Sequence, residues 1–306
     1  MRSRLPILVM FIALLFTALT QAKLETMELV MPGVWFRQGD LDRFGHCNNI
    51  VIEMKEYLIV VDANFPSGAR ALMADIKKVS AKPVKYVFDT HHHGDHAYGN
   101  PVWTRAGATT IAFQAVAGEM KRFEPARWKA DTANRKDVGE LNLPTAEPPR
   151  ETFSKSPHVI DDGTRRVEFH HFGWAHTRGD GFAYLPKEQV LCTGDAVVNG
   201  PFNGYGDGWA ANWPKVVARA RKLKVKHVLP AHGPAGGPEI LAGQEQYVRE
   251  LYDRVKRAVR TGGKMPEASD LPAAVKNWTG PWTKDQVKDI REEIVQGKPR
   301  GELVVK

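Results

Sequence analysis

Apolar residues between positions 34 and 112 alternate with polar ones or form short runs, which is the pattern of β-strands. One stretch differs, because its apolar residues recur at helical spacing from Ala69 to Ile76. Ser67 can cap this helix, which is predicted to run to about Val79. Five strands are predicted around it: Val34–Phe36, Asn49–Glu53 and Tyr57–Asp62 as a hairpin, Val84–Phe88, and Gly107–Ala112.

A similar order of elements recurs in the second half of the chain. A helix is predicted over Pro214–Leu223, with Val216 and Val217 facing inward. Two halves that each contain strands, a helix and a further strand predict a sandwich of two sheets with helices outside. The strands of this half are Arg166–Phe172, Gly181–Tyr184 and Gln189–Thr193 as a hairpin, and His227–Leu229.

Residues 114–151, between these halves, are predicted to form a helix followed by a long surface connection. Connections of this length often cover an active site or are simply mobile, and the sequence favours neither. After Gly237 a long helix is predicted, followed by a Gly- and Pro-rich tail and a short helix over Lys284–Ile294. We therefore expect a main domain over residues 23–237 and a C-terminal helical extension over residues 238–306, packed on the same domain.

The first 22 residues have the pattern of a Sec-type signal peptide. Arg2 and Arg4 precede the apolar run Leu5–Leu19, and Thr20–Ala22 offers small residues for cleavage after position 22. The apolar run is short for a membrane span, so no stable span is expected after cleavage; an uncleaved anchor is the alternative. The pattern predicts a periplasmic or secreted protein.

Composition and charge are those of an ordinary globular protein. The 306 residues are 42% hydrophobic and 25% charged. Removing Arg2 and Arg4 lowers the formal charge from +8 to +6, which suits a solvated basic face or an anionic substrate or membrane surface. Nucleic acid binding is not expected, because no basic patch with interleaved aromatics is evident. Cys47 and Cys192 are too few for a disulfide framework and are expected to be separate buried residues, although pairing stays open.

The densest cluster of candidate ligands follows the predicted strand Val84–Phe88. On a loop at the end of a strand such side chains can converge on a metal ion, whereas a strand would send alternate ones to opposite faces. Nitrogen and carboxylate ligands suit zinc, and also iron or manganese. His92 is not expected to be a ligand, and a solvated histidine-rich loop is the alternative. The candidates form a His-x-His-x-Asp-His pattern: His91, His93, Asp95 and His96.

Three further candidates lie at or just past predicted strands in the second half: His176, Asp195 and His232. Singly, each could be a surface histidine or a turn aspartate. Together with the first cluster, and in this chain order, they indicate one shared metal site.

This ordered set resembles the metallo-β-lactamase fold superfamily of hydrolases, over roughly Met31 to Gly236. The resemblance implies an α/β fold, an αββα four-layer sandwich with the metals at one edge. It also implies two zinc ions per chain, although iron or manganese would suit the same ligands. By the same resemblance, the first ion is bound by His91, His93 and His176, the second by Asp95, His96 and His232, and Asp195 bridges both.

Two divalent ions about 3.5–4 Å apart can generate a hydroxide nucleophile near neutral pH. Asp95 is the expected catalytic residue, because it can orient this nucleophile while it binds metal. Asp62 could hold a ligand histidine by a hydrogen bond or could be a structural turn carboxylate. We therefore expect an exported dinuclear zinc hydrolase that uses a metal-bridging hydroxide on an ester, thioester, lactone or amide-like bond of a small molecule.

Two alternatives to this function remain. The segment Ala175–Thr177 and the strands after it resemble the zinc β-lactamases, so β-lactam hydrolysis is one. The commonest β-lactamase subclass, however, has a cysteine where this chain has Asp195 and a lysine where it has Val198. A bridging aspartate resembles the glyoxalase II type of thioester hydrolase instead. The other alternative is a mononuclear iron persulfide dioxygenase, which metal analysis would distinguish; a non-enzymatic binding module would be expected to have lost ligands.

Substrate contacts are predicted only from closeness in sequence to the ligands. Aromatic and amide side chains on a loop near the metals could hold an apolar ligand with a polar handle, or could simply pack a flexible loop. The sequence predicts no oligomeric state. The candidates are Tyr98, Asn100, Asn203, Tyr205 and Trp209.

Overall fold

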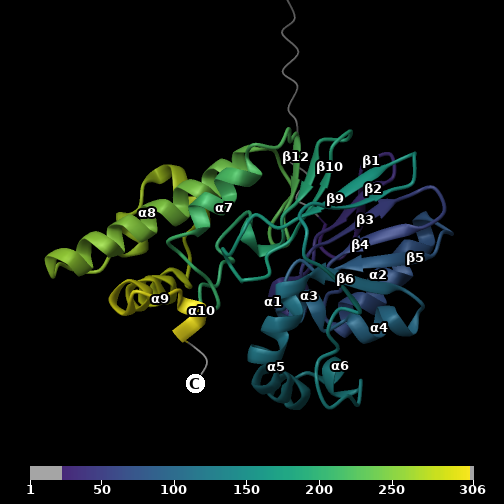
Figure 1. Ribbon diagram of the computed structural model, residues 1–306, viewed down its shortest axis with the longest axis horizontal. Coiled ribbons are helices and arrows are strands. Elements are labelled where there is room, and N and C mark those ends of the chain that lie inside the picture. The colour runs from purple at the N-terminus through teal and green to yellow at the C-terminus, as the bar shows by residue number, and fades with distance from the viewer. Residues whose placement is uncertain (1–22, 304–306) are drawn as a thin grey trace, which may run out of the picture.

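The computed structural model describes residues 23–303, so the predicted signal peptide lies outside the described residues. Two sheets form the centre of the molecule (Figure 1). The larger sheet has seven strands in chain order: β1 (Met27–Met31), β2 (Val34–Arg37), β3 (Asn49–Glu53), β4 (Leu58–Val61), β5 (Val84–Phe88), β6 (Thr109–Phe113) and β7 (Glu151–Phe153). Its pairs are antiparallel from β1 to β4 and parallel from β4 to β7.

The smaller sheet has the strand order β12-β11-β10-β9-β8. All of its pairs are antiparallel except β11 with β12, which are parallel. Parallel neighbours present their carboxyl ends at the same edge, a point on which the functional site depends. The strands are β8 (His158–Asp161), β9 (Arg166–His170), β10 (Phe182–Leu185), β11 (Val190–Cys192) and β12 (His227–Leu229).

The side-chain alternation along the central strands explains why the sheets stack. Ile50 of β3 packs between the sheets, in one apolar cluster with Phe169 of β9. Its neighbour Val51 faces the other way and packs with Leu72 of helix α2 (Pro66–Val79). Because both faces of the larger sheet are buried, β3 and β4 consist mainly of aliphatic residues.

Helices cover the outer face of each sheet and complete four layers (Figure 1). This arrangement confirms the predicted αββα sandwich. On the side of the larger sheet lie α2, α3 (Gly94–Ala97), α4 (Asn100–Arg105), α5 (Gln114–Asn134) and α6 (Lys136–Gly139), with α1 (Leu41–Phe44) between β2 and β3. On the side of the smaller sheet lie α7 (Trp213–Ala220) and α8 (Glu239–Thr261).

Most of the predicted elements are present. β3, β5 and β12 have the predicted bounds, and the others shift by a few residues at their ends. The prediction that Ser67 caps α2 is wrong, since the helix begins at Pro66, whose fixed φ suits a first turn. The Ser67 hydroxyl instead donates to Asp137 of α6 at 2.6 Å. β1, β7 and β8 were not predicted because all three are short and largely exposed or only partly buried.

The C-terminal extension packs on the main body through both apolar and polar contacts. Its remaining elements are the 3-10 helices η2 (Ala268–Asp270) and η3 (Ala273–Trp278), α9 (Thr283–Gln296) and α10 (Arg300–Leu303). Trp278 donates from its indole N–H to the Val198 carbonyl at 2.8 Å, and Gln286 of α9 donates to the Asn203 carbonyl at 2.7 Å. The extension therefore fixes the loop that follows β11.

Cys47 and Cys192 are both buried and free, as expected from the sequence. Within residues 23–303, none of the helices is long and apolar enough to cross a membrane.

We predict that Gly243→Ala destabilises the protein by about 1–3 kcal/mol, because a Cβ on this α8 residue would overlap the Trp278 ring. Gly118→Ala is the matched control. It also lies inside a helix, α5, but its Cβ would meet no atom within 4 Å, so we expect it to be neutral or stabilising by up to about 1 kcal/mol. Urea unfolding of both variants checks this; equal midpoints would show that the Gly243–Trp278 contact does not constrain the packing.

Candidate metal centre

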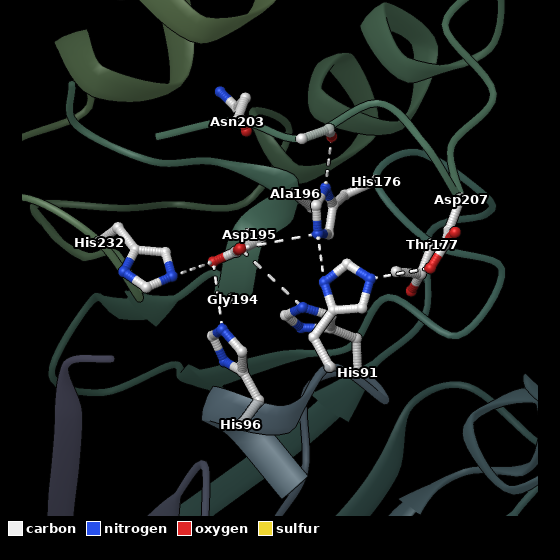
Figure 2. Close-up of polar contacts among 12 residues, drawn as sticks. His91, His96, His176, Thr177, Gly194, Asp195, Ala196, Asn203, Asp207 and His232 are labelled. Carbon is white, nitrogen blue, oxygen red and sulfur yellow. Dashed lines mark hydrogen bonds and ion pairs between the residues drawn. The ribbon is translucent and has the colours of Figure 1, made fainter. Parts of the chain in front are cut away.

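The structure brings all seven predicted metal ligands together at one edge of the sandwich. Figure 2 shows how the side chains of His91, His96, His176 and His232 converge on Asp195. Each ligand segment follows the carboxyl end of a strand. Because β11 and β12 are parallel, their ends place Asp195 beside His232, with 3.4 Å between Asp195 Oδ1 and His232 Nε2. The four segments are the β5–α3 turn with His91, His93, Asp95 and His96, the loop after β9 with His176, the 3-10 helix η1 (Gly194–Ala196) with Asp195, and the loop after β12 with His232.

A glycine allows the two halves of the site to meet. Gly194 has a left-handed backbone (φ +54°), and a Cβ there would lie 2.7 Å from the hydroxyl oxygen of Thr90. Thr90 precedes the first ligand, His91, so any larger residue at 194 would push the two ligand segments apart.

The first group of ligands consists of three imidazoles around one carboxylate oxygen. His176 Nε2 lies 3.1 Å from His93 Nδ1 and 3.6 Å from Asp195 Oδ2. His91 Nε2 lies 3.9 Å from the same oxygen. One ion could contact all four of these atoms, which lie within 4.8 Å of one another.

The second group consists of two imidazoles around the carboxylate of Asp95. His96 Nε2 and His232 Nε2 each lie 3.1 Å from Asp95 Oδ2. The other oxygen of Asp195, Oδ1, lies 3.6 Å from His96 Nε2. Asp195 therefore presents one oxygen to each group, which is the placement expected of a bridging ligand.

The donor atoms fit a pair of cations. His91 Nε2, His96 Nε2 and Asp195 Oδ1 are buried and have no hydrogen-bond partner among the described residues, and buried polar atoms rarely stay unpaired. His93 and His176 each use their other ring nitrogen as a donor, so the nitrogens that face each other at 3.1 Å both carry lone pairs. Two such lone pairs repel each other unless a cation lies between them. Imidazole and carboxylate donors suit zinc.

Hydrogen bonds on the outer side of the rings fix their orientation. His96 donates from Nδ1 to Asp62 at 3.0 Å, so Asp62 fixes one of the predicted ligand rings. His176 donates from Nδ1 to the Gly204 carbonyl at 2.9 Å, and Thr90 contacts His91 Nδ1 at 3.1 Å. In each case the other nitrogen is left to face the site.

Asp207 holds the remaining ligand ring and was not predicted. It is buried, and it accepts hydrogen bonds from His93 Nε2 at 2.9 Å and from His92 Nε2 at 3.1 Å. Arg127 of α5 donates to both of its oxygens, at 2.7 and 2.8 Å. Burial alone would raise the pKa of Asp207, but these donors hold it well below the usual range. His92 thus supports the site from outside the ligand set, consistent with the expectation that it is not a ligand.

The pKa values of the histidines are shifted in opposite directions in the two ligand groups, down in the first and up in the second. Burial, reinforced by the neighbouring imidazoles, lowers the pKa of His91 and lowers that of His93 to about 3. Burial would also lower the pKa of His232, but Asp195 and Asp95 raise it to about 9. Without metal, the first group is therefore neutral at pH 7, whereas His232 holds a proton between two carboxylates.

A cavity of about 680 Å³ opens over the ligands, and none of the five predicted substrate residues lines it. Tyr98 is buried against Trp128 and donates to Glu124, and Asn100 is buried with its amide donating to Asp89. The other three also lie elsewhere: Asn203 bonds to Gln244, Tyr205 packs on Trp213, and Trp209 lies beside Trp174. The segment Gly200–Trp209 does border the cavity, but through other residues: Pro201, Phe202 and Gly204.

Comparison with known protein families matches residues 42–238 to the metallo-beta-lactamase superfamily. A curated relative, the hydroxyacylglutathione hydrolase of Dictyostelium discoideum, is 30% identical over 117 residues. This match covers 37% of the chain and 40% of the relative, so the chain spans less than half the length of that protein.

Two solved structures share the fold. A metallo-beta-lactamase from Pontibacter korlensis superposes with a TM-score of 0.59 at 20% identity, over 73% of this chain and 98% of that one. The crystal structure of the DIM-1 metallo-beta-lactamase gives 0.56 at 19% identity, over 73% and 96%. At these identities the likeness concerns the fold alone.

We predict that the zinc affinity of the metal-free protein rises with pH up to about 9, because His232 must lose its proton before it can bind an ion. For each proton that is released when zinc binds, the zinc affinity rises by a further factor of about ten per pH unit. Competition with a chelator of known affinity between pH 6 and 9 measures this. His232→Ala should lower the slope by about one proton, and a flat profile for the unmodified protein would contradict the assignment.

We predict that Asp207→Asn weakens zinc binding by about 10- to 100-fold, because an amide cannot accept from His93, His92 and Arg127 together. Asp253→Asn, on the exposed face of α8, is the control and should leave affinity unchanged. Equilibrium dialysis with metal counting gives the affinities. If both variants bind zinc equally, His93 does not need Asp207 for its orientation.

Proposed function

Because the chain belongs to the metallo-beta-lactamase superfamily, we propose that it is a dinuclear zinc hydrolase acting on an ester, thioester, lactone or amide-like bond. Family membership and the curated hydrolase relative make it a metal-dependent hydrolase. The number and identity of the ions, the ligand assignment and the substrate are the parts that we propose.

The observation that carries the proposal is the position of Asp195. Its two oxygens face different ligand groups, Oδ2 toward His91 and His176, and Oδ1 toward His96 and His232. A site for a single ion would not need a carboxylate between two sets of histidines. We therefore assign His91, His93 and His176 to one ion, Asp95, His96 and His232 to the other, and Asp195 to both.

When bound, two zinc ions would lower the pKa of a water and polarise the oxygen of the bond to be cleaved. Asp95 lies on the cavity floor, where its carboxylate can accept a hydrogen bond from that water and orient it. It is held there by His96 and His232, and these rings also keep its pKa below the usual value, against the effect of burial. Asp95 therefore remains an acceptor throughout the neutral range.

Two features support an ester- or thioester-like bond over a β-lactam. The curated relative is named for the hydrolysis of an acyl glutathione. Val198, at the position where the commonest β-lactamase subclass has a lysine, is fully buried and does not line the cavity. Neither lysine nor arginine is present among the described lining residues.

The proposal includes export to the periplasm or outside the cell. Its support is the sequence pattern of residues 1–22, with Arg2 and Arg4 before the apolar run Leu5–Leu19. Cell fractionation, with N-terminal sequencing of the mature protein, would test both export and cleavage after Ala22.

We predict that Asp95→Ala lowers kcat at least about 100-fold and removes about one of two zinc ions per chain, because it loses both a ligand and the group that orients water. Asp253→Ala, with an exposed carboxylate far along α8, is the control. The measurements are metal content by mass spectrometry and hydrolysis of nitrocefin, a lactone, a thioester and bis-p-nitrophenyl phosphate.

The outcome also separates the alternatives. Unchanged metal content together with unchanged hydrolysis in Asp95→Ala would refute the proposed mechanism. One iron per chain, with oxygen consumption in place of hydrolysis, would favour a dioxygenase.

A further inference from the structure

The cavity above the ligands is built like a binding site for a small molecule. Its volume of about 680 Å³ is in the range of such sites, and its floor consists of ligand side chains, including His93, Asp195 and His232. A molecule that enters it reaches the reacting centre. What the walls present therefore decides which molecules bind productively.

The walls are mainly apolar and aromatic. Phe65, Phe202 and Trp282 supply rings, with Leu41 and Pro281 beside them. Trp282 is 55% exposed, among the most exposed of the large apolar side chains in residues 23–303. Burying the face of an aromatic ring is energetically favourable, so an exposed ring that lines a cavity can bind the apolar part of a ligand.

The rings are held in place before any ligand binds. Phe65 is covered by the Arg135 guanidinium, 3.5 Å from the ring centroid, and meets the edge of Tyr98 at 5.9 Å. Phe202 lies 6.1 Å from the ring of His232. A wall with fixed rings binds a flat group at a lower entropic cost than a mobile wall.

The third ring is positioned by the C-terminal extension. Gly280 packs directly on Pro201, because a Cβ there would come within 2.6 Å of the proline ring. Close packing at this point places Pro281 and Trp282 in the cavity wall, next to the loop after β11. The extension thus forms part of the binding wall.

The walls offer no partner to an anionic group. Apart from the ligands, Asp42 is the only charged side chain among the described lining residues, and none of them is Lys or Arg. Arg135 is not one of these lining residues: it lies over the Phe65 ring and is engaged with the Phe44 carbonyl and Asp137. A carboxylate carried into these walls would lose its hydration without gaining a cation, and would meet the Asp42 carboxylate at one side.

We infer that the substrate is an uncharged molecule whose reacting carbonyl group sits at the metals and whose apolar, ring-sized part packs against Phe65, Phe202 and Trp282. This inference rests on the proposed function and deepens it. It disfavours β-lactams and glutathione thioesters, both of which carry carboxylates, and favours apolar esters, thioesters or lactones.

A matched pair of metal-binding probes tests the inference without requiring turnover. One is 4-phenylbutanehydroxamate, and the other carries an added carboxylate at the para position of its ring. Titration calorimetry on the zinc-loaded full chain should show the uncharged probe binding at least about tenfold more tightly. Equal affinities, preference for the carboxylate, or no binding of either probe would overturn the inference.

Two substitutions locate the contact. Trp282→Ala should weaken the uncharged probe by about 3- to 10-fold and the carboxylated probe by less. Val295→Ala, an equally exposed apolar residue on α9 away from the cavity, should change neither affinity. Because Trp282 is half-exposed, its removal should not unfold the protein, and circular dichroism checks this. A Trp282→Ala chain that folds but binds both probes as before would remove Trp282 from the site.

Turnover separates this inference from the proposed function. p-Nitrophenyl hexanoate and its analogue with a terminal carboxylate, p-nitrophenyl adipate, share the same reactive ester. A higher kcat/KM for the hexanoate supports both ideas, and turnover of both esters at similar rates sinks the inference alone. Preferential binding of the uncharged hydroxamate without hydrolysis of any ester, thioester, lactone or amide would sink the proposed function, while the preference of the cavity for uncharged ligands would stand.

Discussion

The carboxylate of Asp195 is the feature on which the site depends. It is buried at the end of β11, and a carboxylate in that position is costly unless positive charge compensates for the lost water. His96 and His232 provide part of this charge, yet Oδ1 still lacks a hydrogen-bond partner among the described residues. The fold must therefore hold this group against its preference for water. It does so by pairing β11 on both sides and by a turn that only Gly194 can make beside Thr90.

The same constraint explains the hydrogen bonds behind the ligands. An imidazole whose inner nitrogen is unpaired would rotate to find a partner unless its outer nitrogen is already fixed. Asp62 fixes His96, Asp207 fixes His93, and the Gly204 carbonyl fixes His176. The two aspartates come from distant segments, one from the end of β4 and one from the loop before α7. The site is thus preorganised by the packing of the whole sandwich.

The seven side chains that converge at this edge could be singled out from the sequence because each is marked locally. The His-x-His-x-Asp-His pattern lies within six residues, and His176, Asp195 and His232 each follow a recognisable strand. Asp207 carries no such mark, since it meets His93 across 114 residues of sequence. Tyr98 is the opposite case, a residue predicted to contact substrate that does not line the cavity. It is close to the ligands in sequence, but the short helix α3 turns its side chain inward to Trp128. Closeness along the chain predicts ligands that share a turn, but it does not predict which side chains face a cavity.

The walls of the cavity show why the chemistry was easier to predict than the substrate. The family match covers residues 42–238 and includes every predicted ligand. Leu41, Pro281 and Trp282 lie outside that range but line the cavity, and Gly280, next to Pro281, packs on Pro201. The predicted ligands thus lie within the range that matches the family, whereas part of the cavity wall comes from flanking segments. Gly280 packs on Pro201 just before Pro281 and Trp282, so the substrate preference that we infer rests on the packing of the extension.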